Sequence, residues 1–496
     1  MQARRSVSYR AMNPWSSRFS VYLLIPRVTC CFPAMDGRVD MRMNRYLLLC
    51  VLVSSLGGLL FGFDTAVISG TEKLLQSVFH LSDFWLGFTV ASALIGTIIG
   101  SLTAGYPADH WGRRPTLILI AVLYFVSAVG SGLAWDWYSL VIFRFLGGLG
   151  VGGASVVAPM YIAEITPPQS RGRLVAVVQF NIVLGILLAF LSNYCIALLQ
   201  LGEVEWRWMF GVEAIPAAAF WVLLYGTPRS PRWLVAHGRS GEATEVLVRL
   251  GVDTREAARL VKEIEESLGN RDVAAWEALL SPRYRRSMLL AVAIAAFNQL
   301  SGINALMYYA PRIFEMAGAG KDTAFLQAVA VGGTNLLFTL LAMAVIDRFG
   351  RRFLMLAGSI GYILSLSATA GAFYWYGADF DGLGNAVVLI SLLVFIASHA
   401  FGQGAVIWVF ISEVFPNTVR AYGQALGSFT HWFMCAAISW TFPMIAAASG
   451  GHAFAFYAAM MVLQLLWVLL VMPETKGVPL EEIERRLAGR SGSAAR

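Results

Sequence analysis

Three charged side chains lie inside long apolar stretches of the sequence: Asp64, Arg144 and Glu213. Ionisable groups are costly in hydrocarbon and usually face a cavity or a partner. Loss of water favours the protonated form of a carboxyl group, whereas a nearby guanidinium favours the carboxylate. We therefore predict that Asp64 binds and releases a proton as Arg144 moves, with Glu213 as a third member of the group. The alternative is a fixed ion pair that only holds helices together.

A second group of polar and aromatic side chains is spread over other apolar stretches. Hydrogen bonds between membrane helices, worth about 0.6 kcal/mol on average, explain any one of them but explain the whole set less well. We therefore expect part of the set to line a polar site, and we expect His399 to be a packing residue. The group contains Gln179, Asn298, Gln299, Asn304, Asn335, Trp408, His431 and Trp432.

Charged residues also recur in short loops at nearly constant offsets. These charges are either anchors that orient the loops or parts of a latch that ties two halves of the molecule together, and the matching offsets favour the latch. The first loops contain Asp109, Arg113 and Arg114, repeated 238 residues later as Asp347, Arg351 and Arg352. The expected partners are Glu164 with Arg171, and Glu413 with Arg420.

The composition indicates which elements position these residues. The chain has 496 residues, of which 57% are hydrophobic and 14% are charged, whereas soluble proteins have about 25% charged residues. A water-soluble enzyme is therefore a poor fit, and we predict twelve membrane-spanning helices of roughly 20 residues or more. The apolar stretches are 46–70, 84–107, 114–134, 138–163, 174–199, 207–225, 287–311, 325–346, 353–376, 385–412, 422–446 and 453–472.

A charged segment between the sixth and seventh stretches divides the chain. Residues 226–286 carry charges with apolar residues at helical spacing, which predicts a soluble, amphipathic helical insert. Residues 1–44 contain no apolar run long enough to span a membrane; they are either a disordered tail or the product of an upstream start. The predicted organisation is 1–44 tail, 45–225 first six-helix half, 226–286 helical linker, 287–472 second six-helix half and 473–496 tail.

Basic residues set the expected orientation. The net charge is +7, but the arginines occur in clusters between apolar runs, which is typical of orientation signals and not of a nucleic-acid surface. The positive-inside rule predicts cytoplasmic termini and a cytoplasmic insert, with Arg312 and Lys321 as the main exceptions. The five cysteines have no paired ligand spacing, so we predict neither a disulfide framework nor a zinc site. We also expect no metal and no cofactor.

Several short motifs occur along the chain. They are Gly57–Asp64, Arg144–Gly152, Tyr161–Glu164, Gln299–Asn304 with Tyr308 and Tyr309, and Pro473–Gly477. These motifs resemble those of the sugar porter family within the major facilitator superfamily, and the resemblance extends from about Arg45 to Leu487. One departure is Arg229, where the family usually has glutamate.

The resemblance implies a fold and a central site. The fold is all-α, with twelve helices in two pseudo-symmetric six-helix halves that rock about a sugar site, as in parallel-repeat transporters. Amide side chains match sugar hydroxyls, and aromatic rings match the C–H faces of the sugar. His431 stands where relatives have an amide, so the choice of sugar is open. The implied sugar contacts are Phe61, Gln179, Gln299, Asn304, Tyr308, Asn335, Gly404, Trp408, His431 and Trp432.

The implied function is proton-coupled symport of a monosaccharide, most similar to bacterial proton-coupled symporters, in which an aspartate at the Asp64 position exchanges the proton. We expect a monomer in the lipid bilayer of the inner membrane, with a sugar and a proton as its partners. An uncoupled facilitator, which usually has asparagine at this position, and a non-transporting sugar receptor are the alternatives. An enzyme is not expected, because no nucleophile–base set or metal-ligand cluster is found.

Overall fold

A computed structural model describes residues 44–167, 170–269, 279–377, 379–416, 419–478 and 482–483. The predicted tail 1–44, apart from Asn44, lies outside the described residues, as do most of residues 473–496 beyond Val478 and the side chain of Asp347. The described residues from 44 onward belong to one compact unit. They form helices and contain no β-strand.

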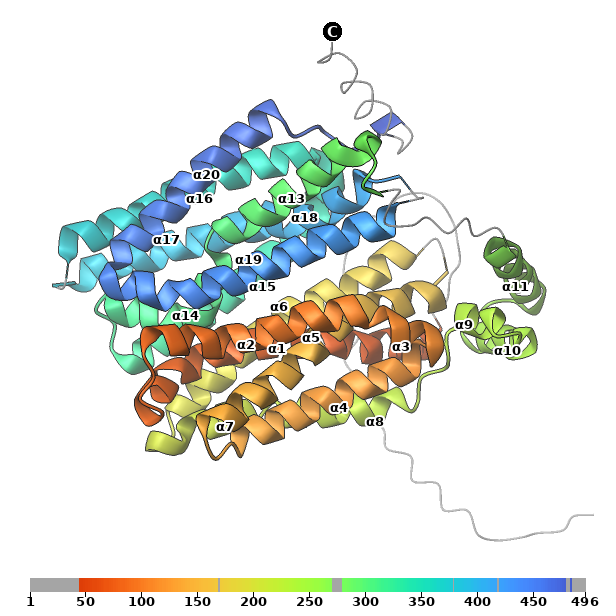
Figure 1. Ribbon diagram of the computed structural model, residues 1–496, viewed down its shortest axis with the longest axis horizontal. Helices are drawn as coiled ribbons and strands as arrows, with labels where there is room; N and C mark the ends of the chain where they lie inside the picture. Colours follow the sequence, from red (N-terminus) through yellow and green to blue (C-terminus); the bar gives the residue numbers. More distant parts are fainter. Residues whose placement is uncertain are drawn as a thin grey trace, which may run out of the picture. The chain divides into compact units, whose positions relative to one another are not determined.

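The first six membrane-length segments come from the N-terminal half of the chain (Figure 1). The second segment continues through a short helix, and the sixth is divided into a 3₁₀ turn and two helices. They are α1 (Arg45–Val78), α2 (Asp83–Thr103) with α3 (Gly105–His110), α4 (Arg113–Gly132), α5 (Trp137–Ile165), α6 (Arg171–Ala197), and η1 (Gly202–Val204) with α7 (Glu205–Gly211) and α8 (Ala214–Leu224).

Six further segments follow in the C-terminal half, so the described residues contain twelve candidate spans. The predicted all-α fold of twelve membrane-length helices is confirmed. The seventh and tenth segments are each divided into two helices. The segments are η2 (Pro282–Tyr284) with α13 (Arg285–Leu300) and α14 (Ile303–Met316), α15 (Lys321–Phe349), α16 (Arg351–Tyr376), α17 (Gly382–Phe401) with α18 (Gln403–Glu413), α19 (Arg420–Ala448) and α20 (Gly450–Leu470).

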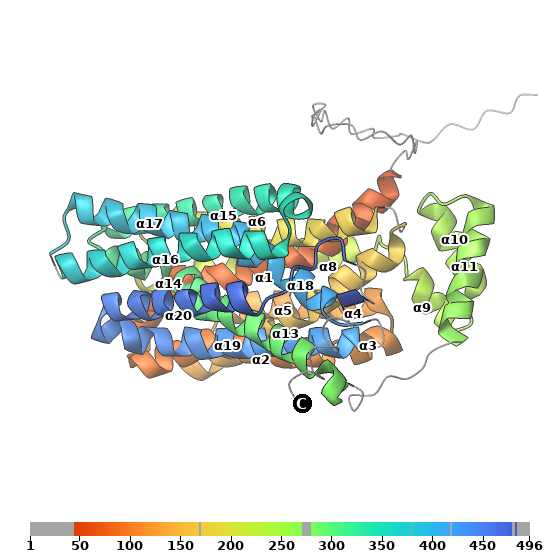
Figure 2. The same ribbon diagram turned by 90° about the horizontal axis from the view of Figure 1, so that it is seen from above.

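Among the described residues between the halves in sequence are the shorter helices α9 (Pro231–Ala236), α10 (Ser240–Arg249) and α11 (Thr254–Gly269). They pack around a small apolar core of their own, and Figures 1 and 2 show them beyond one end of the long helices. The Asn44 side chain, at the start of α1, donates to the Arg249 carbonyl in α10 at 2.8 Å. We call this end of the molecule the insert end and the other the opposite end.

Local sequence explains several helix starts. Asp136 and Ser139 form a capping box at the start of α5, and this satisfies backbone donors that have no helical partner. The Ser139 backbone N–H, which donates to Asp136, holds the pKa of that exposed carboxyl below its usual range. Gly112 (φ +98°) and Gly350 (φ +89°) precede α4 and α16, where positive φ favours glycine.

Glycines of α5 allow close helix packing. A Cβ on Gly148 would lie 1.9 Å from the Ala93 carbonyl oxygen, and one on Gly152 would lie 2.2 Å from that of Thr97. These distances are too short for any side chain, so α2 and α5 touch through their backbones. The close contact holds α5, with Arg144 on it, in a fixed position inside the N-terminal half.

Candidate functional site

Among the described residues, the most extensive contacts between the two halves are those of α1 with α14, α2 with α19, and α6 with α15. A cavity of about 140 Å³ lies where they meet. Beside the cavity, the seventh segment is interrupted at Gly302, which has φ +84°. Gly302 packs against the Tyr457 ring so closely that a Cβ added to it would lie 2.5 Å from the nearest ring atom. Interrupted membrane helices are typical of transporter binding sites, because they expose polar backbone groups to a cavity.

Side chains from both halves line this cavity. The N-terminal half contributes residues of α1 and α6, and the C-terminal half contributes residues of α13–α15 and α17–α19. Among the predicted sugar contacts, all except Trp408 belong to the lining. The predicted residues in the lining are Phe61, Gln179, Gln299, Asn304, Tyr308, Asn335, Gly404, His431 and Trp432.

The polar lining residues are linked to one another. Gln299 donates through Nε2 to Asn298 Oδ1 at 2.9 Å and contacts His431 Nδ1 at 3.2 Å. The Asn304 side chain donates to Gln299 Oε1 at 2.6 Å. Phe61 and Trp432 meet across the halves with ring centroids 5.5 Å apart. An amide cluster beside two aromatic rings can bind a ligand that has both hydroxyls and C–H faces.

Two residues depart from the sequence-based expectations. Trp408 is 39% exposed and does not line the cavity. Its ring packs against the His431 ring, with the ring centroids 5.0 Å apart. His399, expected to be a packing residue, is part of the lining. The lining also contains residues that were not predicted, namely Thr65, Thr339 and apolar residues such as Met307. No sequence signal separates these from other residues of apolar helices.

A buried charge group lies in the N-terminal half beside the cavity. Asp64 Oδ1 is 2.5 Å from Arg144 Nη1, and both side chains are at most 4% exposed. Arg144 also donates to the Asp64 carbonyl and lies over the Phe210 ring. Glu213, at the break between α7 and α8, interacts electrostatically with both residues, and its buried Oε1 has no hydrogen-bond partner among the described residues.

Helix α1 connects this charge group to the cavity. Phe61 and Thr65, four residues apart, lie on one face of α1 and line the cavity, as the helical repeat requires. Asp64 lies between them in sequence but on another face, and it binds Arg144 of α5. A movement of α1 therefore changes both the cavity wall and the ion pair.

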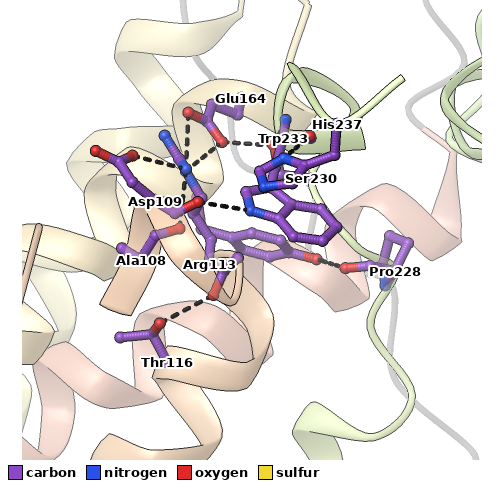
Figure 3. Close-up of polar contacts among 11 residues, drawn as sticks. Ala108, Asp109, Arg113, Thr116, Glu164, Pro228, Ser230, Trp233 and His237 are labelled. Carbon is purple, nitrogen blue, oxygen red and sulfur yellow. Dashed lines mark hydrogen bonds and ion pairs between the residues drawn. The ribbon is translucent and has the colours of Figure 1, made fainter. Parts of the chain in front are cut away.

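At the insert end, the charged loop of the N-terminal half forms a compact network (Figure 3). Arg113 pairs with Glu164 at 2.9 Å and with Asp109 at 3.0 Å. Ser230 donates to the same Glu164 carboxylate. The Trp233 indole donates to the Asp109 carbonyl at 2.9 Å, so the network fastens α9 and its N-cap Ser230 to α3 and α5.

The C-terminal half repeats this arrangement. Arg351 pairs with Glu413 at 2.9 Å, and Thr475 donates to the other oxygen of Glu413 at 2.6 Å. Glu474 in addition accepts from the backbone N–H groups of Arg351 and Arg352 at the start of α16, both at 3.0 Å. In the N-terminal half the corresponding position is Arg229, which lies over the Trp233 ring instead.

The remaining latch candidates bind backbone carbonyls or lie at the surface. Arg114 donates to Leu224 and Tyr225, Arg352 donates to Leu469, and Arg420 donates to Phe415. Arg171 is exposed at the start of α6. The ion pairs Arg113–Asp109, Arg113–Glu164 and Arg351–Glu413 each lie within one half.

At the opposite end, ion pairs do join the halves. The first two pairs link α1 to α14: Arg312 binds Glu72 at 2.6 Å, and Lys73 binds Glu315. The third links α15 to α7, where Lys321 binds Glu205 at 2.9 Å. Arg312 and Lys321 are the two basic residues that departed from the charge pattern of the loops, and each neutralises a glutamate that is only 1% exposed.

Comparisons with known proteins agree with this architecture. Residues 50–487 match the family described as "Sugar (and other) transporter". The chain is 40% identical over 480 residues to the D-xylose-proton symporter of Escherichia coli K12, covering 89% of this chain and 96% of the symporter. It is 34% identical over 447 residues to the arabinose-proton symporter of Bacillus subtilis, covering 89% and 95%.

A solved structure, the inward open conformation of the E. coli xylose transporter XylE, superimposes with a TM-score of 0.79. The two chains are 38% identical in this comparison, which covers 89% of this chain and all of the other.

Proposed function

Since the chain belongs to the sugar transporter family, we propose that it carries out proton-coupled symport of a monosaccharide, a pentose or a hexose, by alternating access. One observation carries the proposal: α1 bears both the buried Asp64, paired with Arg144, and the cavity residues Phe61 and Thr65. The names of two relatives, the xylose-proton and arabinose-proton symporters, support both the sugar and the proton. Membership of this family supports a transporter rather than an enzyme.

The proton cycle follows from the burial of the charges. While Arg144 binds Asp64, the aspartate is ionised, because the guanidinium replaces the lost water. When the halves rock and Arg144 leaves, an ionised Asp64 would be buried without a partner, so it takes up a proton. Glu213 lies close enough to hold Arg144 electrostatically at that stage. Sugar binding and proton binding are thereby coupled through α1.

The sugar sits in the central cavity under this proposal. The amides of Gln179, Gln299, Asn304 and Asn335 meet its hydroxyls, and Phe61, Tyr308 and Trp432 cover its C–H faces, with Gly404 leaving space on one side. His431 meets a hydroxyl where relatives use an amide. These assignments are supported by the shared cavity, which all these residues line.

The charge networks describe an inward-facing state. The halves are joined by ion pairs at the opposite end, whereas the ion pairs of Arg113 and Arg351 at the insert end each lie within one half. The similarity to an inward open structure supports the same assignment. We propose that the insert and both termini are cytoplasmic, that the chain works as a monomer in the inner membrane, and that the latch residues join the halves when the cavity faces outward.

Reconstituted vesicles test the proposal directly. A symporter produces sugar-stimulated proton uptake for at least one sugar in a panel of pentoses and hexoses, and a proton gradient drives accumulation of that sugar. Sugar uptake without proton movement would identify an uncoupled facilitator. Binding without uptake would identify a receptor, and the absence of binding to every sugar in the panel would refute the proposal.

A further inference from the structure

A chain of buried hydrogen bonds leads from the sugar cavity into the C-terminal half. It begins at His399, whose Nδ1 lies 2.7 Å from the Tyr362 hydroxyl. Tyr362 donates to Gln403 Oε1 at 3.4 Å, Gln403 donates to Gln464, and Gln464 donates to Ser359 at 2.8 Å. Tyr362, Gln403, Gln464 and Ser359 are all completely buried. We call these five residues the relay.

The far end of the relay fixes the direction of every hydrogen bond in it. The Ser359 hydroxyl donates to the Met355 carbonyl at 2.7 Å, so its oxygen can only accept from Gln464. The Gln464 carbonyl must then face Gln403, and the Gln403 carbonyl must face Tyr362. A Tyr362 hydroxyl that donates to Gln403 has only lone pairs left for His399.

This direction determines the tautomer of His399. Because the Tyr362 oxygen accepts, Nδ1 of His399 carries the hydrogen, and Nε2 of the neutral ring is an acceptor. The Nε2 edge of the His399 ring lies beside Gly404, which also lines the cavity. A Cβ added to Gly404 would lie 3.4 Å from Nε2. Among the residues that the structure describes, Nε2 has no hydrogen-bond partner.

We propose that His399 is a specificity-determining residue that accepts a hydrogen bond from one sugar hydroxyl, and that Tyr362 is the positioning residue that keeps Nε2 an acceptor. The inference rests on the proposed function and deepens it. The cavity amides both donate and accept, whereas an imidazole held in one tautomer only accepts, so it selects for a hydroxyl at one position of the sugar.

Deoxyfluoro sugars test this assignment, because fluorine replaces a hydroxyl in size but donates no hydrogen bond. D-Glucose and D-xylose are compared with their monodeoxyfluoro derivatives, one for each hydroxyl, by calorimetric titration of the full chain in detergent. The proteins are the wild type, His399→Phe, Tyr362→Phe and, as a matched control, Tyr457→Phe. Tyr457 is a buried tyrosine of the same half whose hydroxyl has no hydrogen bond among the described residues.

In the wild type, fluorine at one position weakens binding about three- to tenfold, the usual range for a lost neutral hydrogen bond. His399→Phe weakens the parent sugar and removes the difference between parent and fluoro derivative at that position only. Tyr362→Phe frees the tautomer, so the difference falls below twofold while the parent sugar still binds. Tyr457→Phe keeps the wild-type profile.

An unchanged fluorine profile in His399→Phe or in Tyr362→Phe would overturn the inference, while the proposed function would stand on the binding of the parent sugars. A uniform loss across all derivatives would do the same, because it would show a purely structural role. A wild type that binds no sugar of the pentose and hexose panel would refute the proposed function and this inference with it.

Discussion

Asp64 and Arg144 are stable in their places only as a pair. Both side chains have lost nearly all contact with water, and removing one partner of a buried ion pair generally costs about 3–5 kcal/mol, because the other charge stays unpaired. Under the proposed function, separation of the two residues during transport therefore requires a proton on Asp64.

We expect Asp64→Asn to abolish accumulation of sugar against its gradient and to leave sugar counterflow largely intact. Asparagine has the shape of a protonated aspartate but releases no proton, so the halves can still rock with sugar bound. The measurement is uptake by vesicles with and without a proton gradient, with Asp322→Asn, an exposed residue at the start of α15, as the control. A variant that still concentrates sugar would show that coupling resides elsewhere.

His431 offers a second test at the cavity. It contacts the Gln299 amide and packs between Trp408 and Trp432. We expect His431→Gln to change the ranking of pentoses and hexoses several-fold, because an amide donates and accepts at different positions, and unpaired buried polar groups penalise the wrong ligand. Coupling through Asp64 should persist. Competition for uptake measures the ranking, and His452→Gln, at an exposed site, is the control.

If the ranking of sugars is the same in His431→Gln and the wild type, His431 has a role in helix packing only.

The residues of the cavity could be predicted from the sequence only in part. Its amides stood out because polar groups are rare in membrane helices. Met307 and Thr339 did not, since their types are common on packed and on lipid-facing surfaces. Trp408 was predicted to contact the sugar but does not line the cavity, because tertiary packing sets which face of α18 points towards it.

Arg229 and Glu474 occupy matching positions in the segments that follow α8 and α20, but they have opposite charges. Glu474 caps the start of α16 by accepting from the backbone N–H groups of Arg351 and Arg352. A carboxylate there satisfies unpaired donors and the positive end of the helix dipole. Arg229, its counterpart, packs on Trp233 at 5.0 Å and supplies no acceptor to α4.

We therefore expect Arg229→Glu to raise the stability of the protein by about 1 kcal/mol, the typical contribution of a helix cap. Thermal unfolding in detergent gives the comparison. Arg229→Ala is the matched control, since it removes the contact with Trp233 without adding a cap. Glu474→Ala should have the reverse effect on the other half. An Arg229→Glu variant no more stable than Arg229→Ala would refute the capping explanation.

The helices themselves were largely predictable, because twelve apolar runs separated by charged loops have few alternatives in a membrane. The ends of the helices were less predictable. The first span was expected to finish near residue 70, but α1 continues to Val78. Glu72, Lys73 and Gln76 would normally end a membrane helix; here they bind Arg312 and Glu315 from α14. A partner 240 residues away in the chain is invisible in the local pattern.

The ion pairs are distributed differently at the two ends of the molecule. The pairs at the opposite end cross between the halves, whereas those of Arg113 and Arg351 at the insert end each lie within one half. Opening of the opposite end must break the crossing pairs and expose Glu72 and Glu205 to water. These pairs therefore contribute to the free-energy difference between the two orientations of the cavity.

Removing one partner of an ion pair that crosses between the halves should shift the equilibrium between the two orientations of the cavity. We expect Arg312→Gln to favour the state that is open at the opposite end, because Glu72, only 1% exposed, is left unpaired in the closed state and regains water when the end opens. Spin labels at exposed positions 203 and 379, in a background without native cysteines, report the distance across this end. The expected result is a larger population at long distance than in the unsubstituted protein.

Two further variants separate the electrostatic effect from general damage. The double exchange Glu72→Arg with Arg312→Glu restores the pair in reverse and should return the population toward its original value, since the attraction depends on the signs and not on which helix carries them. Arg239→Gln removes an ion pair that lies within α10 and its N-cap and should leave the distances unchanged. Equal distance distributions in Arg312→Gln and Arg239→Gln would show that the crossing pair at the opposite end does not control the orientation of the cavity.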